Sequence, residues 1–204
     1  MGYNRLSCRK VMDAVIVFLK NYNIVEVKTR LAKDTSKDFA LNFYKKCVTK
    51  TINEVKKTSL PYYLFWFPEP MEQSKNSFSQ KGKNLGERMY NALNTVFSFG
   101  FNNAIIIGTD IPDLNKEIIL KSFKKLEKYD YVIGPCFDGG YYLIGCGREK
   151  LNYNIFSDIL WSSDKVLENT ENKLKKSGFK YFFLKKLMDI DEAEDFFNYY
   201  SSKR

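Results

Sequence analysis

Short apolar runs alternate with segments of helical periodicity along most of this chain. The run DAVIVFL (residues 13–19) is continuous and rich in β-branched side chains, which predicts a strand buried on both faces. A polar and basic loop follows, and from Asp34 apolar residues recur every three or four positions. This spacing predicts a long helix with Asp34 or Thr35 at its N-cap.

The rest of the chain repeats these two patterns. The predicted strands are residues 62–67, 103–110, 131–134, 141–145 and 180–184, and the predicted helices are about 85–99, 119–126, 162–175 and 192–200. Residues 72–84 are polar and are predicted to form an exposed loop. The alternation predicts an α/β fold, with a mostly parallel sheet covered by helices on both faces. No linker divides the chain, so we expect one domain, residues 1–204, with residues 1–12 as an N-terminal extension.

Composition narrows the chemistry. The chain has 204 residues, of which 44% are hydrophobic and 28% charged, as in ordinary globular proteins. The absence of histidine excludes a Ser-His-Asp triad, a His general base and an HExxH zinc site. The four cysteines form no CxxC pair, so we interpret them as buried thiols of a cytoplasmic protein and expect no zinc. No apolar run approaches the roughly 20 residues of a membrane helix.

The net charge of +9 is compatible with phosphorylated ligands, nucleic acid or an anionic membrane. The lysines are scattered and no nucleic-acid-binding motif is present, so we expect no specific nucleic acid as a partner. Aromatic residues make up 16% of the chain, which leaves room for an apolar interface such as that of a homodimer. The oligomeric state stays open.

Two acidic stretches are candidates for a metal site. Asp110 ends the apolar strand NAIIIGTD, where an acid is costly unless it is exposed, paired or bound to a metal. Mg²⁺ binds a few carboxylate oxygens and shares its shell with phosphates and water. The alternative for Asp110 is an acid that caps the following turn. The stretch LMDIDEAEDF is explained equally by the dipole of the last helix, but its Asp191 could complete a metal site with Asp110.

Three further stretches suggest an anion site. Lys20, Lys28 and Arg30 follow the first strand, where α/β sheets often bind phosphates; a solvated basic loop is the alternative. KGKNLGERM has a glycine turn that leads into a helix, whose N–H groups suit an anion. GPCFDGGYYLIG places Asp138 in a tight turn between two strands, and it should project from the same sheet edge as Asp110.

Taken in order, these stretches resemble a known family. The motifs are VKTRLA, NLGERM, GTDIPDL, GPCFDGGYYLIG, ILWSSDKVLENT and MDIDEAEDF. Over roughly residues 13–199 the chain is similar to the glycosyltransferase-A-like family of small bacterial proteins, and more distantly to phospholactate guanylyltransferase and molybdopterin guanylyltransferase. The resemblance implies a nucleotide-diphospho-sugar transferase fold, which is a three-layer α/β/α sandwich, with Mg²⁺ or Mn²⁺ as cofactor.

The residue patterns and the resemblance together give the candidate residue roles. The candidate catalytic residues are Lys28, Asp110 and Asp138, and the candidate metal ligands are Asp110 and Asp191. The candidate nucleotide-binding residues are Lys20, Lys28, Arg30, Asn84, Gly86 and Arg88, and the candidate acceptor-binding residues are Asp138, Gly139, Gly140, Tyr141, Trp161 and Ser162.

The chain departs from the family at two places. The family's loop before VKTRL carries Pro and Gly, whereas Tyr22 and Val25 stand there in this sequence. The family's DLGERM reads NLGERM, with Asn84 in place of the acid. Because a loop that brings bare backbone close to phosphate has lost its glycine, both departures predict altered nucleotide binding.

Three functions therefore compete. The first is metal-dependent nucleotidyl transfer from an NTP to a small phosphorylated or hydroxyl acceptor, which needs positioning and electrostatics but no histidine. The second is glycosyl transfer from a nucleotide sugar, with Asp138 as the base on an acceptor hydroxyl. The third is a non-catalytic protein that binds a nucleotide or another anion. The basic loop favours the first, because a triphosphate needs more positive charge than a diphosphate.

Overall fold

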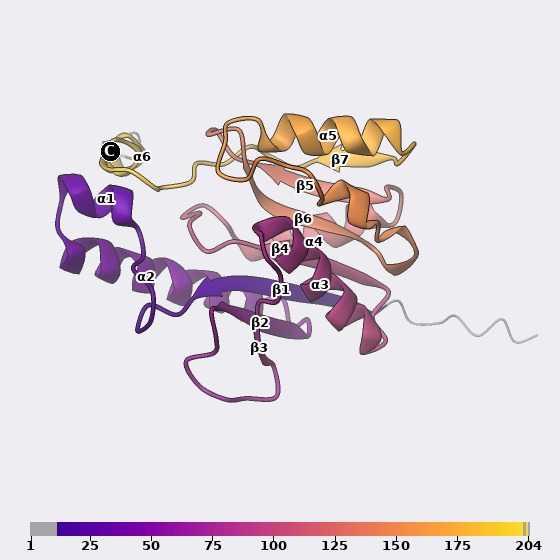
Figure 1. Cartoon of the computed structure of the whole chain (residues 1–204), viewed down its shortest axis with the longest axis horizontal. Coiled ribbons are helices and arrows are strands. Elements are labelled where there is room, and N and C mark those ends of the chain that lie inside the picture. Colours follow the sequence, from indigo (N-terminus) through magenta and orange to yellow (C-terminus); the bar gives the residue numbers. More distant parts are fainter. Residues whose placement is uncertain (1–11, 202, 204) are drawn as a thin grey trace, which may run out of the picture.

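The strands of the protein form one mixed sheet (Figure 1). The computed structural model describes residues 12–201 and residue 203, so the predicted N-terminal extension, residues 1–12, lies outside the described residues apart from Met12. The strands are β1 (Asp13–Lys20), β2 (Tyr62–Phe67), β3 (Ser77–Ser79), β4 (Asn103–Ile107), β5 (Tyr131–Pro135), β6 (Tyr141–Gly147) and β7 (Tyr181–Phe183). They lie in the order β3-β2-β1-β4-β6-β5-β7. Neighbouring strands are parallel except at β6, which pairs antiparallel with β4 and β5, so the mostly parallel sheet is confirmed.

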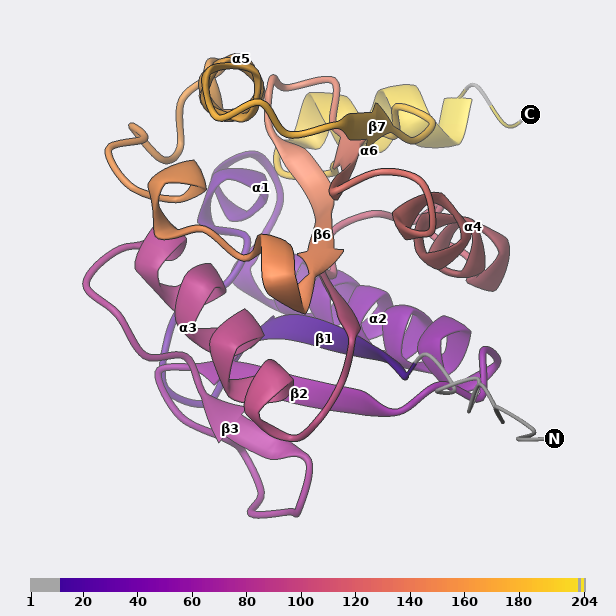
Figure 2. The ribbon, with the colours of Figure 1, turned by 90° about the vertical axis from the view of Figure 1, so that its right-hand side faces the viewer.

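Helices cover both faces of this sheet. They are α1 (Thr29–Asp34), α2 (Lys37–Lys56), α3 (Leu85–Ser98), α4 (Lys116–Leu126), α5 (Val166–Lys176) and α6 (Ala193–Ser201). Figure 2 shows α3 on one side of β1 and β2, and α2 and α4 on the other. Side chains of α5 join those of α3 in one hydrophobic cluster, and side chains of α2 and α4 join a second cluster. The three-layer α/β/α sandwich is therefore confirmed.

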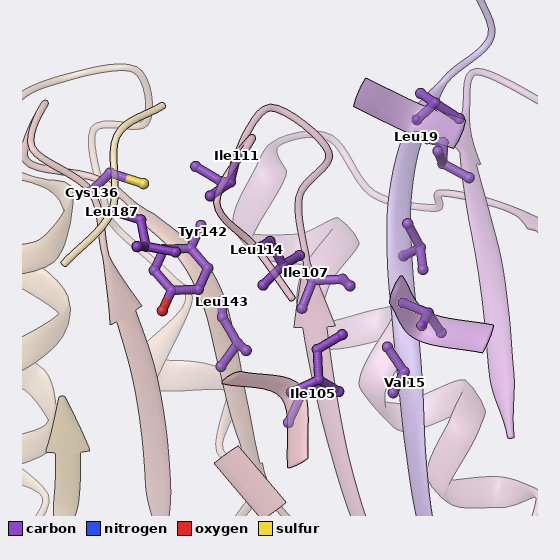
Figure 3. Close-up of a cluster of buried hydrophobic side chains, with 14 of the residues drawn as sticks. Val15, Leu19, Ile105, Ile107, Ile111, Leu114, Cys136, Tyr142, Leu143 and Leu187 are labelled. Atoms are coloured by element: carbon purple, nitrogen blue, oxygen red, sulfur yellow. The ribbon is translucent and has the colours of Figure 1, made fainter. Parts of the chain in front are cut away.

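Strand β1 has an unbroken apolar run because its side chains are buried on both faces of the sheet. Successive side chains of a strand point to opposite faces. Val15, Val17 and Leu19 pack into the cluster beneath α2 and α4, part of which is drawn in Figure 3. Ala14 and Ile16 pack into the cluster beneath α3 and α5. Both sets are almost completely buried, as the sequence predicted for this strand.

The chain order around β1 creates a point where two loops diverge. From β1 the chain runs outward to β2 and β3, and it then returns to place β4 on the other side of β1. The chain therefore continues from β1 and from β4 to strands on opposite flanks of this central pair, β2 on one flank and β5 on the other. Open α/β sheets bind ligands at such a switch point, outside the carboxyl ends of the strands.

Two local predictions were wrong. The basic stretch after β1 contains a short helix, α1, which begins after Lys28 in a left-handed conformation (φ 51°) and which buries Leu31 completely. The next helix is capped by Ser36, whose hydroxyl accepts a hydrogen bond from the N–H of Phe39 at 3.1 Å, and not by Asp34 or Thr35. One apolar residue per turn is too weak a signal to reveal so short a helix.

The predicted exposed loop at residues 72–84 contains strand β3. Its three residues pair with β2 in parallel, and the Phe78 ring stacks on Phe65 at a centroid distance of 5.3 Å. Ser77 and Ser79 flank Phe78, so the strand has a single apolar side chain. Contact with the neighbouring strand, rather than intrinsic preference, holds this segment in the sheet.

Candidate functional site

A cleft of about 740 Å³ lies across the carboxyl edge of the sheet, at the switch point between β1 and β4. This volume is in the range of small-molecule sites. The cleft brings together most of the residues predicted from the sequence: Lys20, Lys28, Arg30, Arg88, Asp110, Asp138, Gly140, Tyr141, Trp161, Ser162 and Asp191. Three other predicted residues, Asn84, Gly86 and Gly139, do not line it.

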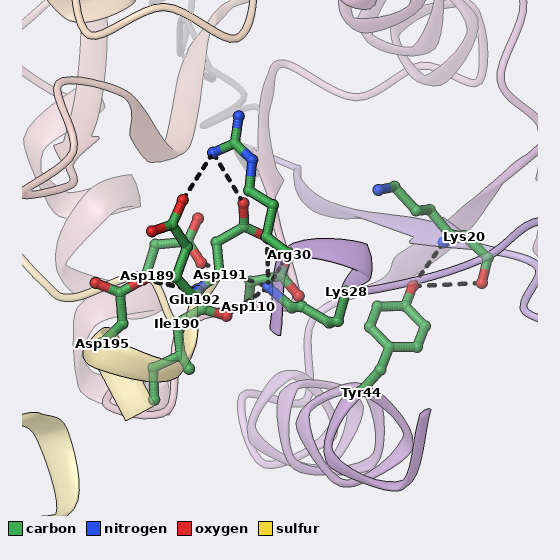
Figure 4. A network of polar contacts seen from close by, with 10 residues as sticks. All are labelled: Lys20, Lys28, Arg30, Tyr44, Asp110, Asp189, Ile190, Asp191, Glu192 and Asp195. Carbon is green, nitrogen blue, oxygen red and sulfur yellow. Dashed lines mark hydrogen bonds and ion pairs between the residues drawn. The ribbon is translucent and has the colours of Figure 1, made fainter. Parts of the chain in front are cut away.

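Lys28 is the centre of the polar network in this cleft (Figure 4). Its side chain is only 3% exposed. The Nζ atom lies 3.0 Å from Asp110 Oδ2, 3.5 Å from Asp191 Oδ1 and 3.7 Å from Asp189 Oδ1. It also donates a hydrogen bond to the carbonyl oxygen of Ile190 at 2.6 Å. One buried cation therefore connects three carboxylates and a backbone carbonyl.

These groups come from three separate parts of the chain. Lys28 precedes α1, Asp110 follows β4, and the segment of residues 189–191 precedes α6. The N–H of Ile190 donates to the carbonyl oxygen of Asp110 at 3.2 Å, so the backbone of the third segment is attached to the end of β4. Lys28 and Ile190 are 162 positions apart in the sequence. The site is thus a product of tertiary structure.

The charges in this network perturb one another. Burial lowers the pKa of the Lys28 ammonium, but the charges of Asp110, Asp189 and Asp191 outweigh it, so this pKa lies above its ordinary value. Burial and the nearby charge of Asp110 raise the pKa of Asp189 well above its usual range, although Lys28 opposes them. The carboxylates are therefore not fully neutralised by Lys28, and additional positive charge would stabilise them.

Two carboxylate oxygens in the network have no hydrogen-bond partner. Oδ1 of Asp110 and Oδ1 of Asp189 are both buried and have no hydrogen-bond partner among the described residues, although Asp189 Oδ1 lies 3.7 Å from the Lys28 ammonium. A buried oxygen without a hydrogen bond is costly, and a bound ion is one of the standard explanations. Oxygen ligands of this kind fit a hard divalent cation such as Mg²⁺, which needs only one or two carboxylates when phosphates and water complete its shell. Within residues 12–201 and 203, no group of three or more acidic or cysteine side chains is arranged to hold a metal by itself.

Asp191, which was predicted as a metal ligand, lies in a different environment. Its side chain is 44% exposed, and its Oδ2 atom accepts a hydrogen bond from the Arg30 guanidinium at 3.4 Å. Its other oxygen faces Lys28. Each oxygen of Asp191 lies near a cation, whereas Asp189 is near Lys28 alone, through Oδ1 at 3.7 Å and without a hydrogen bond, so Asp189 has the better geometry for a metal ligand. Sequence reasoning passed over Asp189, although an acid between Met188 and Ile190 is a signal for a buried carboxylate.

Asp138 occupies the turn between β5 and β6 and is held by local contacts. Its Oδ1 atom accepts a hydrogen bond from the N–H of Gly140 at 2.9 Å, which closes the turn. Gly139 has φ 86°, and a Cβ at this position would overlap the carbonyl oxygen of Asp164. The side chain of Asp138 is exposed to the cleft from the same sheet edge as Asp110, as the sequence predicted.

The predicted residues outside the cleft have evident structural contacts. Asn84 caps α3, because its Oδ1 atom accepts a hydrogen bond from the N–H of Glu87 at 2.9 Å. Gly86 packs so closely that a Cβ would overlap the carbonyl oxygen of Phe156 and the ring of Trp161. Their proposed part in nucleotide binding stays a prediction. The contact of Gly86 with Trp161 does, however, connect the start of α3 to the cleft.

The altered first loop turns away from the cleft. The Tyr22 ring packs edge-on against Tyr44 of α2, at a centroid distance of 6.2 Å. The N–H groups of Ile24 and Val25 both donate to the carbonyl oxygen of Asn21 at 3.0 Å, which folds the loop back on itself. Tyr22 and Val25 line a smaller neighbouring cleft of about 340 Å³ instead. The substitutions therefore leave the main cleft open.

Comparison with known proteins assigns the family. The family described as "Uncharacterized protein conserved in bacteria (DUF2064)" matches residues 56–163, which is more than half of the chain. The chain belongs to this family. The matched part of this DUF2064 protein includes β4 with Asp110, the Asp138 turn and Trp161. No curated protein matches its sequence.

Solved structures show the same fold. A "putative nucleotide-diphospho-sugar transferase" from Desulfovibrio desulfuricans G20 superposes with a TM-score of 0.87 at 27% identity, over 95% of this DUF2064 protein and 88% of that chain. A 4-diphosphocytidyl-2C-methyl-D-erythritol synthase from Anaerococcus prevotii gives a TM-score of 0.58 at 12% identity, over 95% and 97% of the two chains. A cytidylyltransferase from Leptospira borgpetersenii gives 0.54 at 9% identity, over 91% and 84%. The fold is thus of the nucleotide-diphospho-sugar transferase type. In the described part of the chain, no helix is long and apolar enough to cross a membrane.

Proposed function

We propose that this protein is a divalent-metal-dependent nucleotidyltransferase, which transfers a nucleotidyl group from an NTP to a small phosphorylated or hydroxyl acceptor. The observation that carries the proposal is a pair of buried oxygens on Asp110 and Asp189 that have no hydrogen-bond partner among the described residues and lie beside Lys28 in a cleft at the switch point of the sheet. The fold it shares with cytidylyltransferases supports the proposal.

The residues of the chain divide the work by position. Asp110 and Asp189 would hold Mg²⁺ or Mn²⁺, which supplies positive charge to the donor phosphates. Lys28 keeps these two acids in place through its ion pairs. Arg30, whose side chain is 56% exposed in the cleft, is free to turn from Asp191 toward a phosphate.

Asp138 lies on the acceptor side. Its second carboxylate oxygen is not used by the turn, so it can orient an acceptor hydroxyl or accept the proton that the hydroxyl loses. Trp161 and Tyr141 meet edge-on at a centroid distance of 6.4 Å and give this side of the cleft an aromatic wall. The acceptor would attack the α-phosphorus in line, and pyrophosphate would leave.

Glycosyl transfer from a nucleotide sugar is the second candidate. The similarity to the Desulfovibrio desulfuricans protein, described as a nucleotide-diphospho-sugar transferase, favours it. In that reaction the same acids would serve a leaving nucleoside diphosphate, and Asp138 would be the base on the acceptor hydroxyl. Fold kinship alone does not decide between the two chemistries.

Product analysis separates the candidates. The protein is incubated with Mg²⁺, a pool of small metabolites and each NTP or nucleotide sugar in turn. Release of pyrophosphate from an NTP supports nucleotidyl transfer, and release of a nucleoside diphosphate from a nucleotide sugar supports glycosyl transfer instead. Turnover should fall at least a hundredfold in Asp110→Asn and Asp189→Asn. Asp38→Asn, at an exposed residue of α2 outside the cleft, is the matched control and should retain activity.

A non-catalytic protein would behave differently. It would release neither product with any donor, and its ligand binding would not depend on Asp110. Salt-sensitive RNA binding that Asp110→Asn leaves unchanged would identify a basic binding module and would overturn both enzymatic proposals.

A further inference from the structure

The cleft has two chemically different ends. Aspartates 110, 138 and 189 lie at one end, near the ends of β4 to β6. Apolar side chains of Phe18, Leu85 and Met89 line the other end, over β1 and the start of α3, next to the cations Lys20 and Arg88. A nucleotide has the same division, with charged phosphates at one end and a flat, largely apolar base at the other. The apolar end is therefore the natural place for the base, provided that the proposed function is correct.

Gln80 is the neutral polar side chain that lines this apolar end and is held in one orientation. It follows β3, and its N–H donates to the carbonyl oxygen of Trp66 at 2.8 Å, so its backbone is attached to β2. The side-chain amide donates to the carbonyl oxygen of Leu19 at 3.1 Å and to that of Phe65 at 2.9 Å. Gln80 thus spans β1 and β2 beside the cleft.

These two hydrogen bonds decide which way the amide points. A carbonyl oxygen can accept but cannot donate, so only the NH₂ group can face the oxygens of Leu19 and Phe65. Both N–H donors are then used. The Oε1 atom receives no hydrogen bond from any described residue, and it is not among the buried unpaired atoms of the described chain. Gln80 consequently offers the cleft a fixed hydrogen-bond acceptor and no donor.

A fixed acceptor distinguishes among bases. Cytosine, adenine and guanine each carry an exocyclic amino group that can donate a hydrogen bond to Oε1. Uracil has no amino group. Its N3–H can still donate to Oε1, but it lies between two carbonyl oxygens that would repel Oε1, so its hydrogen bond is weaker.

We propose that Gln80 Oε1 accepts a hydrogen bond from the base, and that the cleft therefore binds nucleotides with an amino-bearing base more tightly than uracil nucleotides. The inference rests on the proposed function because it assumes that the ligand is a nucleotide or a nucleotide sugar. It assigns Gln80 to specificity and leaves the reacting groups at the other end of the cleft unchanged.

The test measures the dissociation constants of CTP, UTP, ATP, GTP and ITP in Mg²⁺ by calorimetry, with the full chain and without an acceptor. UTP should bind about tenfold more weakly than CTP, and ITP about tenfold more weakly than the better of ATP and GTP, because the amino donor is replaced by a ring N–H whose neighbouring carbonyl oxygen repels Oε1. In Gln80→Met, which removes the acceptor but keeps the length of the side chain, these ratios should fall to within about twofold. Gln73→Met, an identical change at an exposed position outside the cleft, should leave them unchanged.

Each outcome has a distinct meaning. If nucleotides bind but the native chain does not distinguish CTP from UTP, or ITP from ATP and GTP, the inference is wrong and the proposed function stands. If the preference persists in Gln80→Met, another group reads the base and the assignment of Gln80 is overturned. If no nucleotide binds, the proposed function fails along with the inference. The panel on the native chain decides the question of selectivity even if Gln80→Met does not fold.

Discussion

The two ends of the acidic region are held in place by different means. Asp138 lies in the turn between β5 and β6 and is positioned by the hydrogen bond that its carboxylate accepts from the N–H of Gly140, two residues away. Asp110 and Asp189 are positioned by Lys28, which is far from both in the sequence. The first arrangement depends on local turn chemistry, and the second depends on the whole sheet being assembled. Changes at the two ends should therefore have different energetic consequences.

Removal of the Lys28 charge should have the largest effect. In Lys28→Met the three partly buried aspartates lose their shared cation, and removing the buried partner of such ion pairs costs about 3 kcal/mol. Urea unfolding followed by circular dichroism measures the loss. Lys33→Met, at an exposed lysine of the adjoining helix α1, is the control and should change stability by less than about 0.5 kcal/mol. Equal losses in both variants would contradict the central role of Lys28.

Divalent cations should stabilise the acidic end. At a concentration one hundred times the dissociation constant, a ligand of the folded state adds about 2.7 kcal/mol, so Mg²⁺ or Mn²⁺ should raise the melting temperature. Asp189→Asn should abolish most of this increase, because it removes a proposed ligand oxygen. Asp191→Asn should preserve more of it, since Asp191 is engaged by Lys28 and Arg30. If the metal raised the melting temperature of Asp189→Asn more than that of Asp191→Asn, Asp191 would be the metal ligand.

The turn can be tested with a matched pair of glycines. Gly139→Ala places a Cβ against the carbonyl oxygen of Asp164 at a positive φ, so it should cost about 2 kcal/mol. Gly178 also has a positive φ (72°) but has open space around it, and Gly178→Ala should cost only about 1 kcal/mol. Chemical denaturation of the two variants compares the costs. If they were equal, the close approach at Gly139 would be unimportant.

The smallest effects are expected at Asn84. Asn and Asp are equally good N-caps, so Asn84→Asp should leave stability nearly unchanged, while Asn84→Ala should lose about 1 kcal/mol. Asn84→Asp also restores the acid of the family motif. A large increase in nucleotide affinity in this variant, measured by the same calorimetry as for Gln80, would show that the asparagine had weakened binding beyond its role as a cap.

The same contrast explains how far the sequence could be interpreted. The unbroken apolar run of β1, the Asp-Gly-Gly turn and the order of strands and helices depend on nearby residues, and they were predictable. The position of Asp138 at the edge that carries Asp110 followed from this order. Strand β3 was not predictable, because its pairing with β2 and not its composition holds it in the sheet.

The choice among neighbouring acids was beyond the sequence for a related reason. Asp189 and Asp191 are two residues apart in one acidic stretch, and both lie within 4 Å of the Lys28 ammonium. Only the hydrogen bond from Ile190 to the end of β4, together with the position of Arg30, distinguishes Asp189, the more buried acid, from Asp191. Gln80 illustrates the same limit, since its orientation depends on carbonyl groups from two other strands.

The hydrogen bond between Lys28 and Ile190 also has a consequence in time. The two residues are 162 positions apart, and a ribosome adds about 5–20 residues per second. Lys28 is therefore synthesised on the order of ten seconds before Ile190, whose carbonyl oxygen will accept its hydrogen bond. Until then its ammonium remains hydrated, and Asp110 lacks its backbone contact with Ile190. The cleft consequently becomes complete only after residue 190 has been synthesised.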